Sequence, residues 1–306
     1  MRLRAGVPSG RERGRAPCGP ARAAPLGAPG AAPPPAAARA SVAWATGALA
    51  ASVLAAGCGG ASATTPGGGP VTPPPSPPPA TLAAQLEALS RRAIFFDHAS
   101  VGENVMRGVR GLIAENAGPE PAVVVQNAGP DASAMGPGVW AETNHLYHLN
   151  GSPTDKFARF RADVESGVGA KVDIAMMKLC YADFPIGASA QATFDAYRAS
   201  IDGLRARFPG VRFVHLTVPL ETASAGGYAN PDREAVSTLV RAAYGPSGLV
   251  FDIARLESTR PDGTRELDAD GVPALVPAYT DDGGHLNDVG RARVARALVE
   301  FLSGIP

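Results

Sequence analysis

The feature that most constrains the fold is a regular alternation of short apolar runs with longer helical stretches after residue 80. The runs are continuous rather than alternating, which is typical of strands buried on both faces: 93–96, 122–126, 172–179, 211–218 and 249–253. Helices are expected around and between them at 82–92, 101–116, 157–164, 193–208, 231–244 and 289–302. This order predicts an α/β fold, a three-layer α/β/α sandwich with a parallel, flavodoxin-like five-stranded sheet.

One long segment has no strand or helix pattern of its own. Residues 127–154 contain many Gly, Pro, Asn and Ser, so a long loop is expected there. Loops of this length in compact domains are usually functional or disordered. Trp140 and Tyr147 are its candidate aromatic surfaces for a sugar ring.

The first 80 residues differ in composition from the rest. Residues 1–57 hold seven Arg and one Glu, while the whole chain has 28 basic and 28 acidic residues. The remainder is therefore mildly acidic, which gives no indication of a nucleic-acid partner. Residues 58–80 are rich in Gly and Pro and are expected to form a tether without a core, followed by one catalytic domain over 81–306.

The leader has the pattern of an export signal. Arg39 precedes an uncharged run from Ala40 to Ala56, and the sequence Leu-Ala-Ala-Gly-Cys ends at Cys58. This ending resembles a bacterial lipobox, which implies cleavage before Cys58 and lipidation of its thiol. We expect an exported lipoprotein of the cell envelope, held to the membrane by its lipid anchor only. The alternatives are an ordinary signal peptide or a weak membrane anchor. Removal of Cys18 and acylation of Cys58 would leave Cys180 alone, without a disulfide framework.

Two short segments at opposite ends of the domain carry candidate catalytic groups. Ser100 follows the first predicted strand in the sequence His-Ala-Ser-Val-Gly, and Asp282 and His285 stand in Asp-Gly-Gly-His before the last helix. A serine hydroxyl needs a base to become a nucleophile, and a carboxylate fixes the tautomer of that base. The three residues are therefore a candidate Ser-His-Asp triad.

Each of these residues also has a structural interpretation. Ser100 and Glu103 fit a capping box, Ser-x-x-Glu, at a helix start. Asp282 suits a turn before two glycines, and Asp281 is a competing partner for His285, one residue further away. The presence of all three residue types favours the catalytic interpretation.

The order of these motifs resembles the SGNH/GDSL hydrolase family. That family has a nucleophilic serine after its first strand and an Asp-x-x-His near its C-terminus, and the resemblance covers residues 90–306. It implies a serine ester hydrolase. The family's usual Gly-Asp-Ser is replaced by His98-Ala99-Ser100, so the chain resembles a divergent branch of the family.

The resemblance also points to oxyanion groups. The family's oxyanion glycine corresponds to Gly129, after a strand, and its usual asparagine corresponds to Ala182. One donor is therefore missing or comes from elsewhere, with Asn104 and Asn127 as candidates. The backbone N–H groups of Ser100 and Gly129 would bind the oxyanion.

Ligands of open α/β sheets bind beyond the carboxyl ends of the strands. Ser100, Gly129, Tyr181 and Asp183 all follow predicted strand ends, and the loop of His285 can reach the same rim. Tyr181 and His98 are candidate substrate-binding residues; His98 is equally compatible with a packed histidine at a strand end.

Other chemistries have weaker support in the sequence. His145 and His148, with Asp155, have a metal-like spacing but no flanking pattern, so no metal is predicted, and nothing demands a cofactor. Cys180 ends a strand and is an alternative nucleophile.

The predicted substrate is a small-molecule or glycan ester, with a short acyl or acetyl group on a carbohydrate. A non-catalytic envelope lipoprotein that binds a glycan or protein is the rival hypothesis, and a cysteine hydrolase is the third.

Overall fold

The computed structural model describes residues 80–306, apart from 117–120, 185–186 and 226–229. The predicted leader, Cys58 and most of the predicted tether lie outside the described residues. Within the described part of the chain, none of the helices combines the length and the apolarity that crossing a membrane requires.

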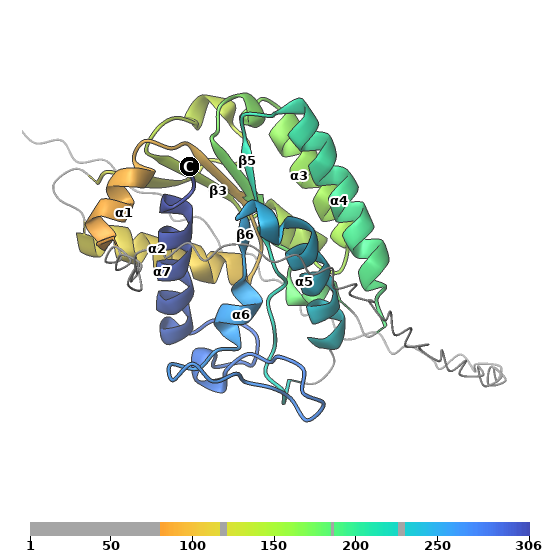
Figure 1. Cartoon of the computed structure of the whole chain (residues 1–306). Helices are drawn as coiled ribbons and strands as arrows, with labels where there is room; N and C mark the ends of the chain where they lie inside the picture. Colours follow the sequence, from red (N-terminus) through yellow and green to blue (C-terminus); the bar gives the residue numbers. More distant parts are fainter. Residues whose placement is uncertain (1–79, 117–120, 185–186, 226–229) are drawn as a thin grey trace, which may run out of the picture. The chain divides into compact units, whose positions relative to one another are not determined.

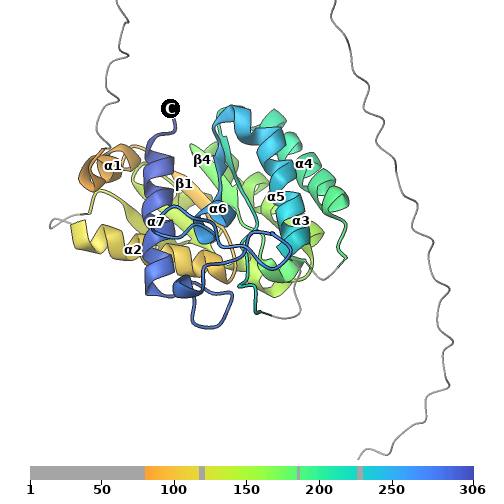
Figure 2. The same ribbon diagram turned by 60° about the horizontal axis from the view of Figure 1, so that its bottom comes forward.

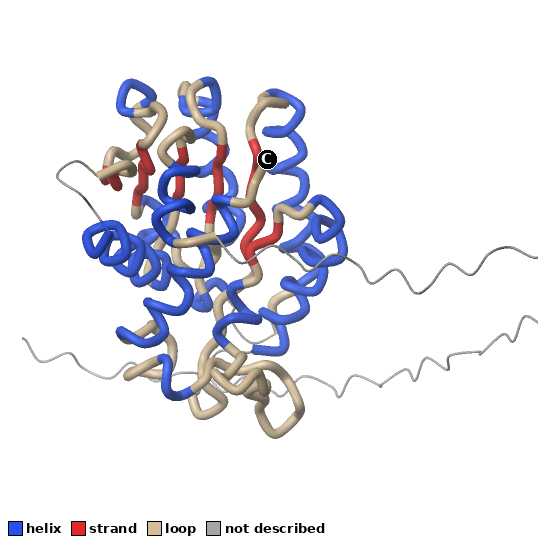
Figure 3. The backbone as a smooth tube through the Cα atoms, turned by 60° about the vertical axis from the view of Figure 1, so that its left-hand side comes forward, coloured by secondary structure: helices blue, strands red, loops and turns tan. Residues whose placement is uncertain are grey.

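The centre of the fold is a six-stranded sheet in which every pair of neighbours is parallel. The strands lie side by side (Figure 3), and the hydrogen-bond pairing gives their order as β2-β3-β1-β4-β5-β6. Their bounds are β1 Ile94–Asp97, β2 Val124–Asn127, β3 Val139–Thr143, β4 Ile174–Met177, β5 Arg212–Leu216 and β6 Val250–Phe251. The predicted parallel α/β class is confirmed, with one strand more than expected.

The additional strand is β3, which lies within the segment expected to be a loop. Without it, the remaining order matches the flavodoxin-like order 2-1-3-4-5. β3 pairs with β1 on one side and with β2 on the other, so it separates these two strands. Trp140 belongs to β3 and is fully buried, so the prediction that it contacts a sugar is wrong, whereas Tyr147 is 53% exposed.

Helices cover both faces of the sheet. α1, α2 and α7 lie on one face, and α3, α4 and α5 lie on the other (Figures 1 and 2). Their bounds, with that of α6, are α1 Leu82–Leu89, α2 Val101–Asn116, α3 Pro153–Glu165, α4 Ala190–Arg207, α5 Asn230–Tyr244, α6 Ile253–Glu257 and α7 Asp288–Ser303.

The apolar runs of the strands explain this layering. In β1, Ile94 and Phe96 belong to the core beneath α1, α2 and α7, while Phe95 belongs to the core beneath α3 and α4. Successive side chains of a strand point to opposite faces, so a strand covered on both sides is apolar at each position.

The carboxyl ends of the strands form the rim that carries the candidate site. α2 begins directly after the turn that follows β1, and a short 3-10 helix, η4 (Tyr181–Asp183), follows β4. A second 3-10 helix, η2 (His145–Leu149), follows β3. Residues 258–287 form the long loop segment before α7, and loops gather at this end of the sheet in Figure 3.

Candidate active site

The structure brings Ser100, His285 and Asp282 into one hydrogen-bonded line. Ser100 Oγ lies 2.6 Å from His285 Nε2, and His285 Nδ1 lies 2.7 Å from Asp282 Oδ2. A proton on Nδ1 is donated to the carboxylate, which leaves Nε2 free to accept the hydroxyl proton. This is the geometry required of a nucleophile, its base and the group that orients the base.

The loop of His285 is shaped by Asp282 itself. Oδ1 of Asp282 accepts the backbone N–H groups of Gly284 at 3.0 Å and His285 at 2.8 Å, while Oδ2 contacts the imidazole. Partial burial alone would raise the pKa of Asp282, but these amides and the ring of His285 hold it well below its usual range. Asp281 instead accepts from the side chain of Asn287, so it is not the partner of His285.

Ser100 occupies a strained turn between β1 and α2. Its φ is +52°, and it is the sole non-glycine residue with positive φ in the described part of the chain. A serine on a sharp strand-to-helix turn projects its hydroxyl out of the backbone, as in the nucleophile elbow of α/β-hydrolases. The capping box is not formed, because the Ser100 hydroxyl contacts His285 and the Glu103 carboxylate contacts Arg110.

Tyr181 forms one wall of the site. Its ring stands nearly perpendicular to that of His285, with centroids 5.6 Å apart, and its hydroxyl lies 3.3 Å from both imidazole nitrogens. Gly284 permits this contact, because a Cβ there would lie 2.9 Å from the Tyr181 ring. Burial is the largest cause that raises the pKa of Tyr181 above its usual value, so the phenol stays protonated.

Asn104 lies one helical turn after Ser100 and joins the two halves of the site. Its Oδ1 accepts the backbone N–H of Leu286 at 3.1 Å, directly after His285. Asn104 therefore fixes the position of the histidine loop relative to α2. This leaves its amide Nδ2 as the group that can donate to a substrate.

Asn127 and Gly129 do not lie beside Ser100, which corrects the oxyanion assignment. Both follow β2, and β3 lies between β2 and β1. The N–H of Gly129 also points to the carbonyl of Glu142, at 3.4 Å. Asn144 follows β3, which pairs directly with β1, and sequence analysis missed it because β3 was not recognised. The only signal for β3 in the sequence was the apolar run Val139–Ala141.

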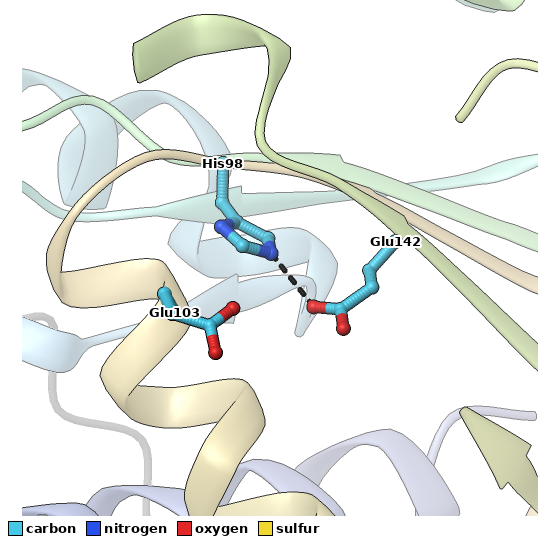
Figure 4. A group of neighbouring side chains, drawn as sticks. All are labelled: His98, Glu103 and Glu142. Atoms are coloured by element: carbon cyan, nitrogen blue, oxygen red, sulfur yellow. Dashed lines mark hydrogen bonds and ion pairs between the residues drawn. The ribbon is translucent and has the colours of Figure 1, made fainter. Parts of the chain in front are cut away.

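His98 is buried beneath the turn that carries Ser100. Only 1% of it is exposed, and its Nε2 lies 2.8 Å from Glu142 Oε2, with Glu103 on the other side (Figure 4). The prediction that His98 binds substrate is therefore wrong, and the packed alternative holds. Arg110 donates to both Glu142 and Glu103, and this ties the first turns of α2 to the end of β3.

The same cluster offers metal-ligand atoms. Atoms of His98, Glu103 and Glu142 lie within 4.8 Å of one another, which would suit a divalent cation by distance. The guanidinium of Arg110 already donates to both carboxylates. These residues therefore fit an ion-pair network better than a metal centre.

The other residues singled out in the sequence, His145, Asp183 and Cys180, make contacts that suit a structural role. His145 Nδ1 lies 2.8 Å from Arg159 Nη2, so this ring nitrogen is already used. Asp183 is buried and accepts from Lys156 Nζ and the Cys180 N–H, both at 2.7 Å. Cys180 is itself 1% exposed, while Nε2 of His285 faces the serine. This arrangement disfavours the thiol as nucleophile.

Comparison with known proteins gives similarity at the level of structure alone. No protein-family model matches the chain, and no curated protein matches it. Similar solved structures include an acetyl xylan esterase, with 16% identity and a TM-score of 0.43 over 69% of this chain and 99% of that one.

A lipase/acylhydrolase from Enterococcus faecalis has 15% identity and a TM-score of 0.42, over 69% of this chain and 95% of its own. A proposed lipolytic protein of the G-D-S-L family from Desulfitobacterium hafniense has 11% identity and a TM-score of 0.43, over 68% and 98%. The Desulfitobacterium hafniense protein is described as a member of the G-D-S-L family, the family that the sequence motifs resemble.

Proposed function

We propose that this chain is a serine ester hydrolase with Ser100 as nucleophile, His285 as general base and acid, and Asp282 as the group that orients His285. The observation that carries this proposal is the unbroken line of two hydrogen bonds, 2.6 Å and 2.7 Å long, from the serine through the imidazole to the carboxylate.

In the first half of the reaction, Ser100 Oγ attacks the carbonyl carbon of the ester while its proton passes to His285 Nε2. The tetrahedral intermediate collapses to an acyl-serine, and His285 returns the proton to the departing alcohol. Water then attacks the acyl-serine with His285 again acting as base, which releases the acid and restores the hydroxyl. Asp282 stabilises the imidazolium in both halves.

The oxyanion that forms needs donors aimed at it. We assign this role to the backbone N–H of Ser100, at the N-terminal end of α2, together with Nδ2 of Asn104. This pair replaces the glycine after β2 and the asparagine that is Ala182 in this chain. Tyr181 packs against His285 and limits the positions that the imidazole can adopt.

The substrate class we propose is a carboxylic ester with a short acyl or acetyl group on a carbohydrate. The exposure of the site supports this, because 41% of the His285 side chain and 57% of the Asp282 side chain reach solvent. A site open at one rim accommodates a large alcohol portion such as a glycan.

The test is reaction of the purified chain with a fluorophosphonate, followed by intact-mass measurement and peptide mapping. We expect one adduct on Ser100, no adduct in Ser100→Ala, and strongly slowed labelling in His285→Ala. Asp281→Asn is the matched control, because Asp281 contacts Asn287 rather than His285. Labelling that persists in Ser100→Ala would overturn the proposal.

A second candidate is a non-catalytic binding protein on the same fold, which the alanine at position 182 favours. A folded chain that neither reacts with the fluorophosphonate nor hydrolyses any acetylated sugar, yet binds a glycan, would support this alternative.

We also propose export and lipidation at Cys58, which the sequence Leu-Ala-Ala-Gly-Cys supports. Labelling of cells with a palmitate analogue tests this. We expect label in the wild-type chain and none in Cys58→Ala. Equal labelling of the two would contradict the proposal.

A further inference from the structure

A polar cavity lies one strand away from the serine turn. It has a volume of about 640 Å³ and includes Thr143 at the end of β3. Thr143 pairs in register with Asp97, three residues before Ser100, and its carbonyl accepts the N–H of His98. Neighbouring strands lie about 4.8 Å apart, so the cavity and the serine share one rim of the sheet. The polar residues that line it are Asn127, Thr143, Asn144, His145, His148 and Arg159.

The positively charged side chain that lines this cavity is Arg159, and the carboxylate of Asp163 holds it in place. Its Nε lies 3.0 Å from Oδ1 of Asp163, whose side chain is 6% exposed, while 44% of the Arg159 side chain remains exposed. Its Nη2 donates to Nδ1 of His145 at 2.8 Å, which places the ring proton of a neutral His145 on Nε2. The buried carboxylate thus orients the guanidinium, which in turn fixes the tautomer of a neutral His145.

A second carboxyl lies beneath Asp163 without adding negative charge at neutral pH. Asp97 is fully buried, and it interacts with the carboxyl group of Asp163 and the backbone N–H of His98. Burial first, and then the charge of Asp163, raise the pKa of Asp97 to about 8. The protonated form of Asp97 is therefore favoured, and Asp163 is the carboxylate that pairs with Arg159.

The cavity presents several hydrogen-bond donors. They are the remaining guanidinium nitrogen of Arg159, Nε2 of His145 and the side-chain amides of Asn127 and Asn144. A guanidinium with an adjacent N–H donor matches the oxygens of a carboxylate better than it matches a neutral hydroxyl.

We propose that this cavity binds a carboxylate of the substrate, so that the chain prefers esters that carry a negative charge. An example is a uronic acid with an O-acyl group and a free carboxylate. The inference rests on the proposed function and names the substrate class of the same site. Arg159 is the specificity-determining residue, and His145 assists it.

The first arm of the test compares matched esters. The mono-4-nitrophenyl ester of adipic acid and 4-nitrophenyl hexanoate differ only in a terminal carboxylate against a methyl group, and they probe a charge on the acyl portion. O-acetylated galacturonate and O-acetylated galactose probe a charge on the alcohol portion. We expect kcat/KM to favour the charged member of at least one pair.

Arg159→Gln is expected to reduce that charged-to-neutral ratio about tenfold or more, the typical effect of one lost charged hydrogen bond. Arg161→Gln is the matched control, because Arg161 lies on the same helix, pairs with Glu165 four residues later and does not line the cavity. The control variant should keep the wild-type ratio. Equal ratios in wild type and Arg159→Gln for both pairs would overturn the inference while the ester hydrolase stands.

The second arm does not depend on catalysis. Calorimetric titration of Ser100→Ala with galacturonate and with galactose should show binding of the charged sugar alone, and Arg159→Gln should abolish it. Absence of galacturonate binding, together with no preference for the adipate ester in the first arm, would overturn the inference. Binding of galacturonate by a chain that hydrolyses no ester would support the carboxylate site and overturn the hydrolase instead.

Discussion

Nε2 of His285 lies 2.6 Å from Oγ of Ser100, although the two residues are 185 positions apart in the sequence. The contact joins the turn after β1 to the loop before α7, and Asn104 fastens these elements through the Leu286 N–H. The chemistry proposed for this chain depends on the precision of that junction.

Asp282→Asn tests the group that orients the base. An amide can hold the imidazole in the wrong tautomer, so we expect kcat to fall by roughly 10³- to 10⁴-fold in a folded protein. Esterase assays with circular dichroism measure this. Asp281→Asn is the control, since Asp281 contacts Asn287 rather than His285. Equal losses in the two variants would contradict the assignment.

Asn104 is tested by two substitutions that separate its two roles. Asn104→Asp keeps an acceptor for the Leu286 N–H but removes the amide donor, while Asn104→Ala removes both. We expect kcat to fall about 10²- to 10³-fold in both variants if Nδ2 stabilises the oxyanion. Recovery of activity in Asn104→Asp would show that Asn104 acts through the loop alone.

Gly102→Ala tests the packing beneath the serine turn. The added Cβ would lie 2.4 Å from Cβ of His98, so α2 must move, at a cost of about 1–3 kcal/mol and with reduced kcat. Gly111→Ala in the same helix meets nothing within 4 Å and should gain up to about 1 kcal/mol. Urea unfolding of both variants checks this, and a neutral effect of Gly102→Ala would refute it.

Asp97 is expected to make stability depend on pH. Burial and Asp163 raise its pKa from 3.8 to about 8, so between these values the native chain keeps a proton that the unfolded chain releases. The free energy of unfolding therefore falls as pH rises through this window, by at most about 1.4 kcal/mol per pH unit from this group.

Asp97→Asn removes that titration. It should flatten the decline and leave the variant more stable than wild type at pH 8. Denaturation at pH 5, 6.5 and 8 measures this, with the exposed Asp195→Asn as control. An unchanged pH profile in Asp97→Asn would rule out a raised pKa for this carboxyl.

The sequence predicted the fold class because β1 and β4 are apolar at nearly every position, as is typical of strands covered on both faces. It missed β3 because Val139-Trp140-Ala141 is a short run that follows Gly136-Pro137-Gly138, and turn residues dominated that window. Pairing with β1 supplies the stabilisation that local propensity does not.

The contact of Ser100 with His285 and Asp282 was predictable for two reasons. Asp282 and His285 are close in sequence, and Ser100 directly follows a strand end. The oxyanion residues were not predictable in this way. Whether Asn127 and Gly129 lie near Ser100 depends on which strand neighbours β1, and the sequence did not reveal that strand. His98 was undecided in sequence because its partner, Glu142, lies on the strand that was missed.

Asp282 organises its own loop, because a single carboxylate receives two backbone amides and the imidazole within four residues. His285 and Asp282 thus form a locally stabilised loop, and the rest of the fold has only to hold that loop against Ser100. Separation of this loop from Ser100 breaks far fewer contacts than unfolding of the sheet does. On heating, this protein is therefore expected to lose its reactivity reversibly at a temperature where its secondary structure is still intact.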